Sequence, residues 1–529
     1  MSSSLSKLFL TLLAALFTQC LYAAKFPIGI NTNEVMQIDS SVPFINLFKQ
    51  ALPFDEANSK LTHGYIQYDQ NGWPKNLNGG QAGTNLLHWL PAGTLPVGNY
   101  TVLYDGQGKL EYTDDAKVIS RSPGKDIIYI NPGADKFFKV TLIIKQSDPR
   151  NYIRNIRVLP PGGICANNPF KRVENARQCH GNFLAFATHY QQILFNPDYL
   201  RFMKDFDTIR FMNMSGITRN PMTSWGQMPH MQEATWAGKE GKRGAPLEVM
   251  VALANKLNRD AWFNIPERAN DDLVRRYAQY VKQHLRPNLK VYIEYTNEAW
   301  NPQFTAARYV RSMGAKQGLG LDYNGGHRYY VKRAAEIMRI WKQAFGGSKR
   351  LVRVLGAWSA NPRLTEMFLG MPGVPQSFDV VAIAPYFFTH EKVEAQVTSV
   401  PSVFKLLKDD KNPYSLNNVR KMIQRQQNIV KKHGLKLVAY EGGQHLYTPK
   451  NRSSKQAPTR YYIGANRAWP MEQMYTEFLN SWNQVTAGSL FVLFSAPRTY
   501  QAYGSWGLKE HINQPASQAP KYRAVKKFL

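Results

Sequence analysis

The segment Val291-Tyr292-Ile293-Glu294-Tyr295-Thr296-Asn297-Glu298-Ala299-Trp300-Asn301 has the pattern of a β-strand that stops at an Asn-Glu pair. Apolar and polar residues alternate up to the pair, and an aromatic residue follows it. A second segment of this kind, Leu435-Lys436-Leu437-Val438-Ala439-Tyr440-Glu441-Gly442-Gly443, ends at Glu441. Parallel α/β barrels carry their functional side chains at the C-terminal ends of the strands. The two segments therefore predict such a barrel, with one carboxylate at each of two strand ends.

The chain on either side of these segments alternates between strand-like and helix-like stretches. Helical periodicity is clear after Asp271-Asp272, because Leu273, Tyr277 and Val281 then fall on one helix face. The predicted strands in this half of the chain cover residues 208–212, 261–265, 291–296, 352–356, 380–384, 436–440 and 490–494. These are one short of the eight that close a (β/α)8 barrel. We assign the missing first strand to residues 26–31.

Residues 60–161 have a different character, with short alternating runs separated by Gly and Pro turn clusters. This spacing predicts an antiparallel β-sandwich. The sandwich is either inserted in the first strand-to-helix connection or N-terminal to a barrel whose first strand lies near Ile156. We favour the insertion, because residues 42–52 look helical and follow Gly29-Ile30-Asn31 as a barrel unit requires. The expected fold class is thus α/β, a (β/α)8 TIM barrel with an inserted β-sandwich. The expected divisions are a signal peptide (1–24), a first barrel unit (25–59), the sandwich (60–161) and the remaining barrel (162–529).

The N-terminus has the features of a secretory signal peptide. Lys7 precedes an apolar run over residues 8–17, and Ala23-Ala24 offers a cleavage site. This predicts a secreted or periplasmic protein. The apolar run is too short to span a membrane and no later stretch is long enough, so we expect no membrane span.

Export leaves Cys165 and Cys179 as the two cysteines of the mature chain. In an oxidising compartment they would close a loop of about 15 residues, which stabilises a protein by roughly 3 kcal/mol. The alternative is a pair of buried free thiols. Two cysteines are too few for a zinc site, and we expect neither a metal nor another cofactor.

The formal net charge of +29 is compatible with nucleic acid, an anionic polysaccharide or a negatively charged surface as partner. The sequence contains no recognisable nucleic-acid-binding module, so we expect no nucleic acid. Two long loops after the second and seventh barrel strands hold basic residues, namely Lys239, Lys242, Arg243, Lys450, Arg452, Lys455, Arg460 and Arg467. They are either basic walls of a cleft that binds an anionic glycan or solvated surface charge. We expect the protein to be a monomer.

Asn297-Glu298 after the fourth strand, with Glu441 after the seventh, resembles the clan A glycoside hydrolases, which carry their catalytic carboxylates on those two strands. An Asn-Glu pair alone is common, but this placement is specific. More loosely, the chain resembles exported bacterial proteins with such a barrel, some of them labelled cellulose-binding. The resemblance implies a retaining glycoside hydrolase that acts on a β-linked polysaccharide or oligosaccharide by double displacement. Glu298 would be the acid/base and Glu441 the nucleophile.

The same resemblance gives roles to three more residues. Asn297 matches the residue that binds the sugar 2-hydroxyl, while Arg210 and Tyr386 match those that hold the nucleophile ionised and oriented. For each carboxylate, the alternative is a buried salt bridge to a barrel arginine. Glu294 would point into the barrel below Glu298, and we expect it to be a structural partner of Arg210 or Arg353, because an unpaired buried carboxylate is costly.

One departure from the family concerns the aromatic floor of the sugar site. The family usually presents a Trp at the end of strand eight, where this chain has Phe494-Ser495-Ala496, and Trp506 is the candidate to replace it. Further candidates for sugar contact or for loop packing are Trp225, Trp300, Trp358, His390 and His445. The missing Trp and the positive charge keep open a second class of function, a non-catalytic carbohydrate-binding or surface-adhesion protein on a glycosidase-like barrel.

Overall fold

The computed structural model describes residues 25–219, 222–238, 241–448 and 453–529. Eight parallel strands close into a barrel in the order β1-β14-β15-β16-β17-β18-β20-β22. They are β1 (Ile28–Asn31), β14 (Thr208–Arg210), β15 (Asp260–Ile265), β16 (Val291–Tyr295), β17 (Leu351–Gly356), β18 (Val380–Ile383), β20 (Lys436–Ala439) and β22 (Phe491–Leu493). All eight predicted strands are confirmed, including the first at the start of the described chain.

The barrel strands are almost wholly buried, because helices cover their outer faces and side chains fill the interior. Strand β1 shows this best, since all four of its residues are buried. It pairs with β14 on one side and with β22 on the other, which closes the barrel. In this register Asn31 lies beside Arg210, so both are at the C-terminal end of the barrel.

Several helices of the barrel begin at a residue whose side chain caps the helix. The side chain of Asn270, for example, accepts a hydrogen bond from the backbone N–H of Leu273 at the start of α5. The main helices are α3 (Pro197–Met203), α4 (Leu247–Leu257), α5 (Asp271–His284), α6 (Thr305–Lys316), α7 (Tyr323–Phe345), α8 (Pro362–Leu369), α11 (Val400–Lys408), α12 (Leu416–Lys432), α13 (Thr459–Arg467), α14 (Pro470–Thr486) and α15 (Pro520–Lys526).

The helix predicted over residues 42–52 is wrong. The structure has only a short 3-10 helix there, η1 (Leu47–Gln50). Val42 has a φ of 44°, in the left-handed region, and Pro43 follows it, so an α-helix cannot pass through this point. The first helix of the barrel is instead α3, which comes after the inserted strands and leads directly into β14.

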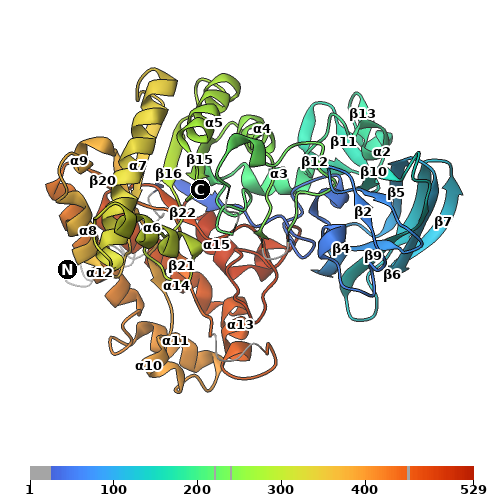
Figure 1. The fold of residues 1–529 in the computed structure, drawn as a ribbon. Coiled ribbons are helices and arrows are strands. Elements are labelled where there is room, and N and C mark those ends of the chain that lie inside the picture. The colour runs from blue at the N-terminus through green and yellow to red at the C-terminus, as the bar shows by residue number, and fades with distance from the viewer. Residues whose placement is uncertain (1–24, 220–221, 239–240, 449–452) are drawn as a thin grey trace, which may run out of the picture.

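The antiparallel strands between β1 and β14 form an extra domain beside the barrel (Figure 1). One sheet has the order β10-β5-β8-β7 and another the order β4-β9-β6, and they share a core that includes Tyr100, Leu110, Ile128 and Leu142. This is the predicted sandwich. Its strands are β4 (Ala82–Pro91), β5 (Gly98–Asp105), β6 (Gly108–Asp114), β7 (Ala116–Ser122), β8 (Lys125–Ile130), β9 (Phe137–Ser147) and β10 (Arg154–Leu159). The domain boundaries at residues 60 and 161 stay a prediction.

Smaller strands precede and follow the sandwich strands in the sequence. They are β2 (Gln67–Tyr68), β3 (Pro74–Asn76), β11 (Gly163–Cys165), β12 (Asn168–Val173) and β13 (Phe183–Ala185). The added domain follows the C-terminal end of β1 and meets the barrel loops near that end. The backbone N–H of Ala234 donates to Asn71 O at 2.8 Å, and the side chain of Asn513 donates to Thr94 O at 3.2 Å. The domain therefore lies on the side of the molecule that carries the candidate site.

Cys165 and Cys179 form the expected disulfide, with an S–S distance of 2.07 Å. It joins β11 to the short 3-10 helix η3 (Ala176–Gln178) and so closes the small sheet next to the sandwich. Within the described residues, no helix is both long enough and apolar enough to cross a membrane. The predicted signal peptide lies outside the described residues.

Candidate active site

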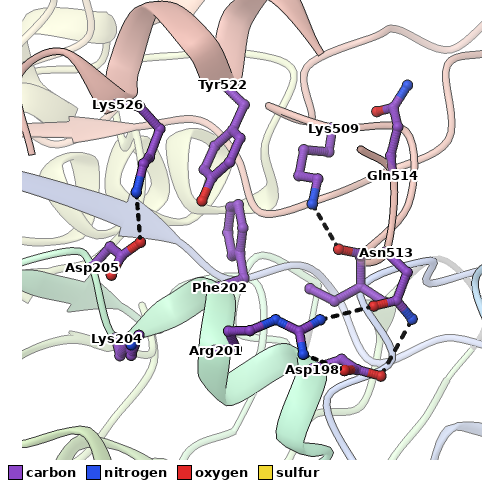
Figure 2. Close-up of a pocket in the computed structure, with 11 residues that line it drawn as sticks. Asp198, Arg201, Phe202, Lys204, Asp205, Lys509, Asn513, Gln514, Tyr522 and Lys526 are labelled. Atoms are coloured by element: carbon purple, nitrogen blue, oxygen red, sulfur yellow. Dashed lines mark hydrogen bonds and ion pairs between the residues drawn. The ribbon is translucent and has the colours of Figure 1, made fainter. Parts of the chain in front are cut away.

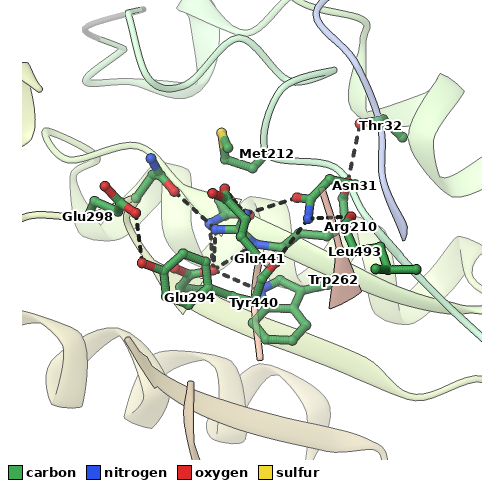
Figure 3. Close-up of polar contacts among 12 residues, drawn as sticks. Asn31, Thr32, Arg210, Met212, Trp262, Glu294, Glu298, Tyr440, Glu441 and Leu493 are labelled. Atoms are coloured by element: carbon green, nitrogen blue, oxygen red, sulfur yellow. Dashed lines mark hydrogen bonds and ion pairs between the residues drawn. The ribbon is translucent and has the colours of Figure 1, made fainter. Parts of the chain in front are cut away.

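Arg210 is the centre of a buried polar network at the C-terminal end of the barrel (Figure 3). Its Nε and Nη2 donate to Glu294 Oε2 at 3.1 and 2.9 Å. Nη1 donates to Glu441 Oε1 at 2.8 Å and to Asn31 Oδ1 at 3.0 Å. Nη2 also donates to Asn297 Oδ1 at 3.1 Å. All five N–H groups of the guanidinium are used, so its position is fixed by four neighbouring side chains.

Glu294 is the lower anchor of this network, and the prediction that it pairs with Arg210 is confirmed. Its Oε2 also accepts hydrogen bonds from Trp262 Nε1 at 2.9 Å and Asn264 Nδ2 at 2.8 Å, both on the adjacent strand β15. Burial raises the pKa of Glu294, while Arg210 and these two donors oppose the rise. Arg353 pairs elsewhere, with Asp379 at 2.7 Å.

Glu441 follows the end of β20 and is held by two donors. Arg210 donates to its Oε1, and the Tyr386 hydroxyl donates to its Oε2 at 2.9 Å. Burial raises the pKa of Glu441 to about 7, and the nearby charge of Glu298 adds to this rise, whereas Arg210 and Tyr386 lower it. Burial and the charge of Glu298 thus favour the protonated carboxyl, while both donors favour the ionised form.

Glu298 lies beyond the end of β16 and has different partners. The Tyr440 hydroxyl donates to its Oε1 at 2.8 Å, and Asn301 Nδ2 donates to its Oε2 at 2.8 Å. The residue is half-buried, and its φ of 44° is in the left-handed region, which is unusual for a residue with a long side chain. Backbone strain of this kind is concentrated at functional sites. Glu298 and Glu441 thus share the same end of the barrel but contact separate sets of donors.

The two tyrosines remain donors over the whole neutral range. Burial raises the pKa of Tyr386 far above its ordinary value, and Glu441 and Glu298 raise it further. Burial and the same two carboxylates also raise the pKa of Tyr440. Burial lowers the pKa of Arg210, but Glu294 and Glu441 outweigh this and the net shift is upward. The site therefore keeps one fixed positive charge and two neutral phenols around its carboxylates.

Asn297 is oriented by this network. Its Oδ1 accepts a hydrogen bond from Arg210. This bond fixes the orientation of the amide, so that Nδ2 is directed away from Arg210. The residue is buried, with 3% of its surface exposed. Among the described residues no hydrogen bond is made by Nδ2, so its N–H groups are available to a bound ligand.

Aromatic side chains form one wall next to Glu441. Trp506 Nε1 donates to His445 Nδ1 at 3.0 Å, and the Trp506 ring lies edge-on to Phe494 with centroids 5.9 Å apart. His445 also lies 5.4 Å from the ring of Tyr386. Burial lowers the pKa of His445 to about 4, so its imidazole is neutral at pH 7 and accepts from Trp506. Trp506 thus lies beside the end of β22, the eighth barrel strand. It is the residue that the sequence indicated as the candidate to replace the family's Trp at this position.

Two side chains donate hydrogen bonds to the backbone of the loop that carries Trp506. Gln444 Nε2 donates to Ser505 O at 2.8 Å, and the buried Lys521 of α15 donates to the same oxygen. Gly504 has a φ of 131°, and a Cβ there would lie 2.3 Å from the Trp506 ring, so only glycine fits. The C-terminal helix therefore supports the aromatic wall.

The other aromatic candidates lie in three different environments. Trp300 is 5% exposed and packs edge-on against Tyr440 with centroids 6.4 Å apart, which supports the tyrosine that contacts Glu298. Trp358 is 46% exposed after β17, and Trp225 is half-buried in the 3-10 helix η4 (Trp225–Gln227). His390 stacks on Tyr414 with ring centroids 5.7 Å apart. Sugar contact by any of them stays a prediction.

Two of the basic loop residues are neutralised by acidic neighbours. Arg243 is 3.3 Å from Asp55 and 3.5 Å from Glu56. Arg467 donates to both carboxylate oxygens of Glu510, at 2.7 Å each. Lys239, Lys450 and Arg452 lie outside the described residues. Arg243 and Arg467 are therefore charges committed to neighbours rather than to a ligand.

Sequence reasoning missed four side chains of the network, namely Asn31, Trp262, Asn264 and Tyr440. Strand parity was the available signal for the pair on β15, because Trp262 and Asn264 alternate with buried apolar residues that face outward. Asn31 ends the first strand as a polar residue in an apolar run. Tyr440 carried no such signal, because a tyrosine at a strand end is usually core.

The arrangement combines two carboxylates with different surroundings, a buried cation and a wall of aromatic rings. One carboxylate, Glu441, accepts hydrogen bonds from a cation and a phenol, and both donors stabilise its ionised form. The other, Glu298, is contacted only by neutral donors. This is the pattern expected of a carboxylate that attacks and a carboxyl that transfers a proton. In the described part of the chain, no group of three or more His, Cys, Asp or Glu residues could hold a metal ion.

No protein-family model matches the chain, and no curated protein matches it. Solved structures with a similar fold include the Thermobacillus composti GH10 xylanase, at 13% identity over 61% of this chain and 89% of that chain (TM-score 0.35). Another is an endo-1,4-beta-xylanase from Caldicellulosiruptor owensensis, at 13% identity over 62% and 92% (TM-score 0.38). A third is a Bacteroidetes-affiliated GH5 cellulase, at 12% identity over 62% and 84% (TM-score 0.36). At identities of 12–13% and TM-scores of 0.35–0.38, these likenesses assign the chain neither a family nor an activity.

Proposed function

We propose that the protein is an exported retaining glycoside hydrolase that cleaves a β-linked polysaccharide or oligosaccharide by double displacement. Glu441 is the nucleophile, Glu298 the acid/base, and Asn297 the donor to the sugar 2-hydroxyl. The observation that carries the proposal is the unequal environment of the two carboxylates. Arg210 and Tyr386 both donate to Glu441, whereas Glu298 accepts from Tyr440 and Asn301. The β-linkage rests on the sequence resemblance alone.

The first step forms a glycosyl–enzyme ester. An oxygen of the ionised Glu441 attacks the anomeric carbon, and the bond from that carbon to the glycosidic oxygen breaks. Glu298 gives its proton to the departing oxygen. Arg210 and Tyr386 hold Glu441 in place for the attack, which reduces the entropic cost of aligning it.

The second step returns the enzyme to its starting state. Glu298, now ionised, takes a proton from a water molecule, whose oxygen attacks the anomeric carbon. The bond between that carbon and Glu441 breaks, and the sugar leaves with its original anomeric configuration. The aromatic wall around Trp506 and His445 provides apolar faces against which a sugar ring can pack.

Export to a secreted or periplasmic location is part of the proposal. The Cys165–Cys179 disulfide supports it, because disulfides persist in oxidising compartments and are rare in the cytosol. Arg243 and Arg467 are paired with acids, so these two loop residues give no support to an anionic glycan as substrate.

The test is hydrolysis of a panel of aryl β-glycosides, neutral β-glucans, xylans and mannans, and acidic polysaccharides, with the first-formed anomer read by NMR. The proposal expects at least one β-linked substrate to be cleaved and the β-anomer to appear first. An α-anomer as first product would exclude double displacement. Binding of a glycan without cleavage of any substrate would instead support the alternative, a non-catalytic carbohydrate-binding protein.

A further inference from the structure

A cavity lies on the side of the barrel, and neither Glu298 nor Glu441 lines it. It has a volume of about 430 Å³ and lies between α3 and the C-terminal segment that leads into α15 (Figure 2). Its size is within the usual range for small-ligand pockets, which starts at about 300 Å³. Phe202 and Tyr522 form its wall, with ring centroids 5.4 Å apart. Nothing in the proposed hydrolysis uses this cavity.

The side chains around the cavity carry more positive than negative charge. Four cations line it, Arg201, Lys204, Lys509 and Lys526, against two acids, Asp198 and Asp205. Both acids are already committed. Asp198 is 2.9 Å from Arg201 and 3.2 Å from Arg172, a residue outside the lining, and Asp205 is 3.5 Å from Lys526. The cavity therefore has an excess of two positive charges, which favours an anion.

Lys509 is the most deeply placed of these cations. It is 8% exposed, and its Nζ donates to Ile512 O at 2.8 Å. The Nζ lies 5.2 Å from the ring centroid of Tyr522 and 6.0 Å from that of Phe202. Within the described residues, no carboxylate is in contact with it. A buried ammonium without a counter-ion is costly, and a bound anion would supply the missing charge.

We propose that this cavity binds a monosaccharide-sized anion, a sugar that carries a carboxylate, phosphate or sulfate group. The oxyanion would pair with Lys509, and the apolar face of the sugar would lie against the Phe202–Tyr522 wall. The site is separate from the candidate catalytic carboxylates, so it does not depend on the proposed hydrolysis.

Binding at this site has a measurable proton linkage. Burial lowers the pKa of Lys509 to about 8, Arg201 adds to this and Asp198 opposes it. The other charged or titratable groups around it are Asp205, Lys526, Tyr522, Glu510 and His511. Burial lowers the pKa of His511 to about 4 and raises that of Tyr522 to about 12, so neither titrates between pH 7 and 9. A bound anion raises the pKa of Lys509, so binding at pH 8 should take up a fraction of a proton, and affinity should fall from pH 7 to pH 9.

The experiment is isothermal titration of the full chain with glucuronate, glucose 6-phosphate, inorganic phosphate and glucose, at pH 7 and pH 9. We expect one equivalent of at least one anionic sugar to bind, and glucose to bind at least tenfold more weakly. Tighter binding of the anionic sugar than of inorganic phosphate would show that the aromatic wall contributes. Equal binding of phosphate and sugar would reduce the site to a simple anion site and overturn the sugar part of the proposal.

Three variants assign the binding to Lys509. Lys509→Met should weaken binding at least tenfold, and Lys509→Arg should keep it while removing the proton uptake and the pH dependence, because arginine stays charged. Lys332→Met, which removes the same charge from an exposed position on α7, should change nothing. A melting temperature measured for each variant separates loss of the site from loss of folding. No binding by the wild type, or equal binding by Lys509→Met in its folded state, would overturn the proposal.

Discussion

Arg210 faces more negative charge than it can neutralise. It contacts Glu294 and Glu441 directly, and Glu298 adds a third carboxylate nearby. Burial is the main reason why the pKa of Glu441 is raised although two donors hold it, and the repulsion from Glu298 adds to the rise. Because Glu298 and Glu441 interact, their titration belongs to the pair. The acidic limb of the activity profile should therefore have an apparent pKa near 7.

Replacing Tyr386 by Phe should move this acidic limb to higher pH. The hydroxyl donates to Glu441 and favours its ionised form, so its loss raises the pKa of the nucleophile. A hydrogen bond to a charged group contributes about 1.5–3 kcal/mol, which corresponds to an upward shift of about one to two pH units. The measurement is kcat/KM against pH.

Tyr447→Phe is the matched control for this shift. Its ring packs near His445 in the same aromatic wall, with centroids 5.9 Å apart. In Tyr447→Phe, the acidic limb of kcat/KM against pH should have the same apparent pKa as in the wild type. A Tyr386→Phe profile that overlays the wild type would show that the hydroxyl does not tune Glu441.

Arg210→Met should destabilise the whole barrel. It leaves Glu294 buried without its counter-ion, and breaking a buried ion pair costs about 3–5 kcal/mol. Denaturant unfolding at pH 7 measures the effect. The double variant Arg210→Met with Glu294→Met removes both charges of this pair and should recover part of the loss, because Glu441 still lacks its counter-ion. A single variant as stable as the wild type would mean that the network does not stabilise the fold.

At the scale of elements, the barrel was predictable and one helix was not. The eight strands are short apolar runs bounded by polar residues or turns, and their burial is what such runs require. The helical appearance of residues 42–52 came from composition alone. The left-handed Val42 and the following Pro43 prevented a helix, and tertiary contacts decided the local structure.

The site was predictable only where a position within the barrel implied a role. Arg210, Tyr386 and Glu441 were expected because their strand ends match those of the family that the sequence resembles, and the structure brings the three together. The contact between Tyr440 and Glu298 could not be found this way, because it joins loops whose paths depend on the whole fold. The support of the Trp506 loop by α15 was hidden for the same reason.

Lys521→Met tests that support. The substitution removes the donor that α15 gives to Ser505 O but keeps a buried side chain of similar length. The Trp506 loop should loosen, and kcat/KM should fall about tenfold, equal to about 1.4 kcal/mol, mainly through KM. Steady-state kinetics on the best panel substrate measure this.

The comparison variant for Lys521→Met is Lys527→Met, at the end of the same helix. It removes a half-exposed ion pair with Glu472, 2.8 Å long, and should leave both kinetic constants unchanged. An unchanged KM in Lys521→Met would mean that α15 does not position the aromatic wall.

For the molecule as a whole, we expect the disulfide to contribute to stability rather than to chemistry. The bridge joins residues separated by 14 positions and lies beside the sandwich. Replacing both cysteines by serine should lower the free energy of unfolding by about 3 kcal/mol. Chemical denaturation measures the loss, and kcat and KM at 25 °C should stay at wild-type values. A large fall in kcat for the folded variant would instead connect the small sheet to the barrel site.

The assignment of the two carboxylates is tested most directly by azide rescue of Glu441→Ala and Glu298→Ala, with a β-aryl glycoside that the wild type cleaves. Azide should react in the space left by each missing carboxyl. Glu441→Ala should give an α-glycosyl azide, because azide then attacks the substrate itself from the nucleophile's side. Glu298→Ala should give a β-glycosyl azide, because azide then attacks the glycosyl–Glu441 ester. Exchanged anomers, or wild-type hydrolysis by both variants without azide, would show that the two roles are wrongly assigned.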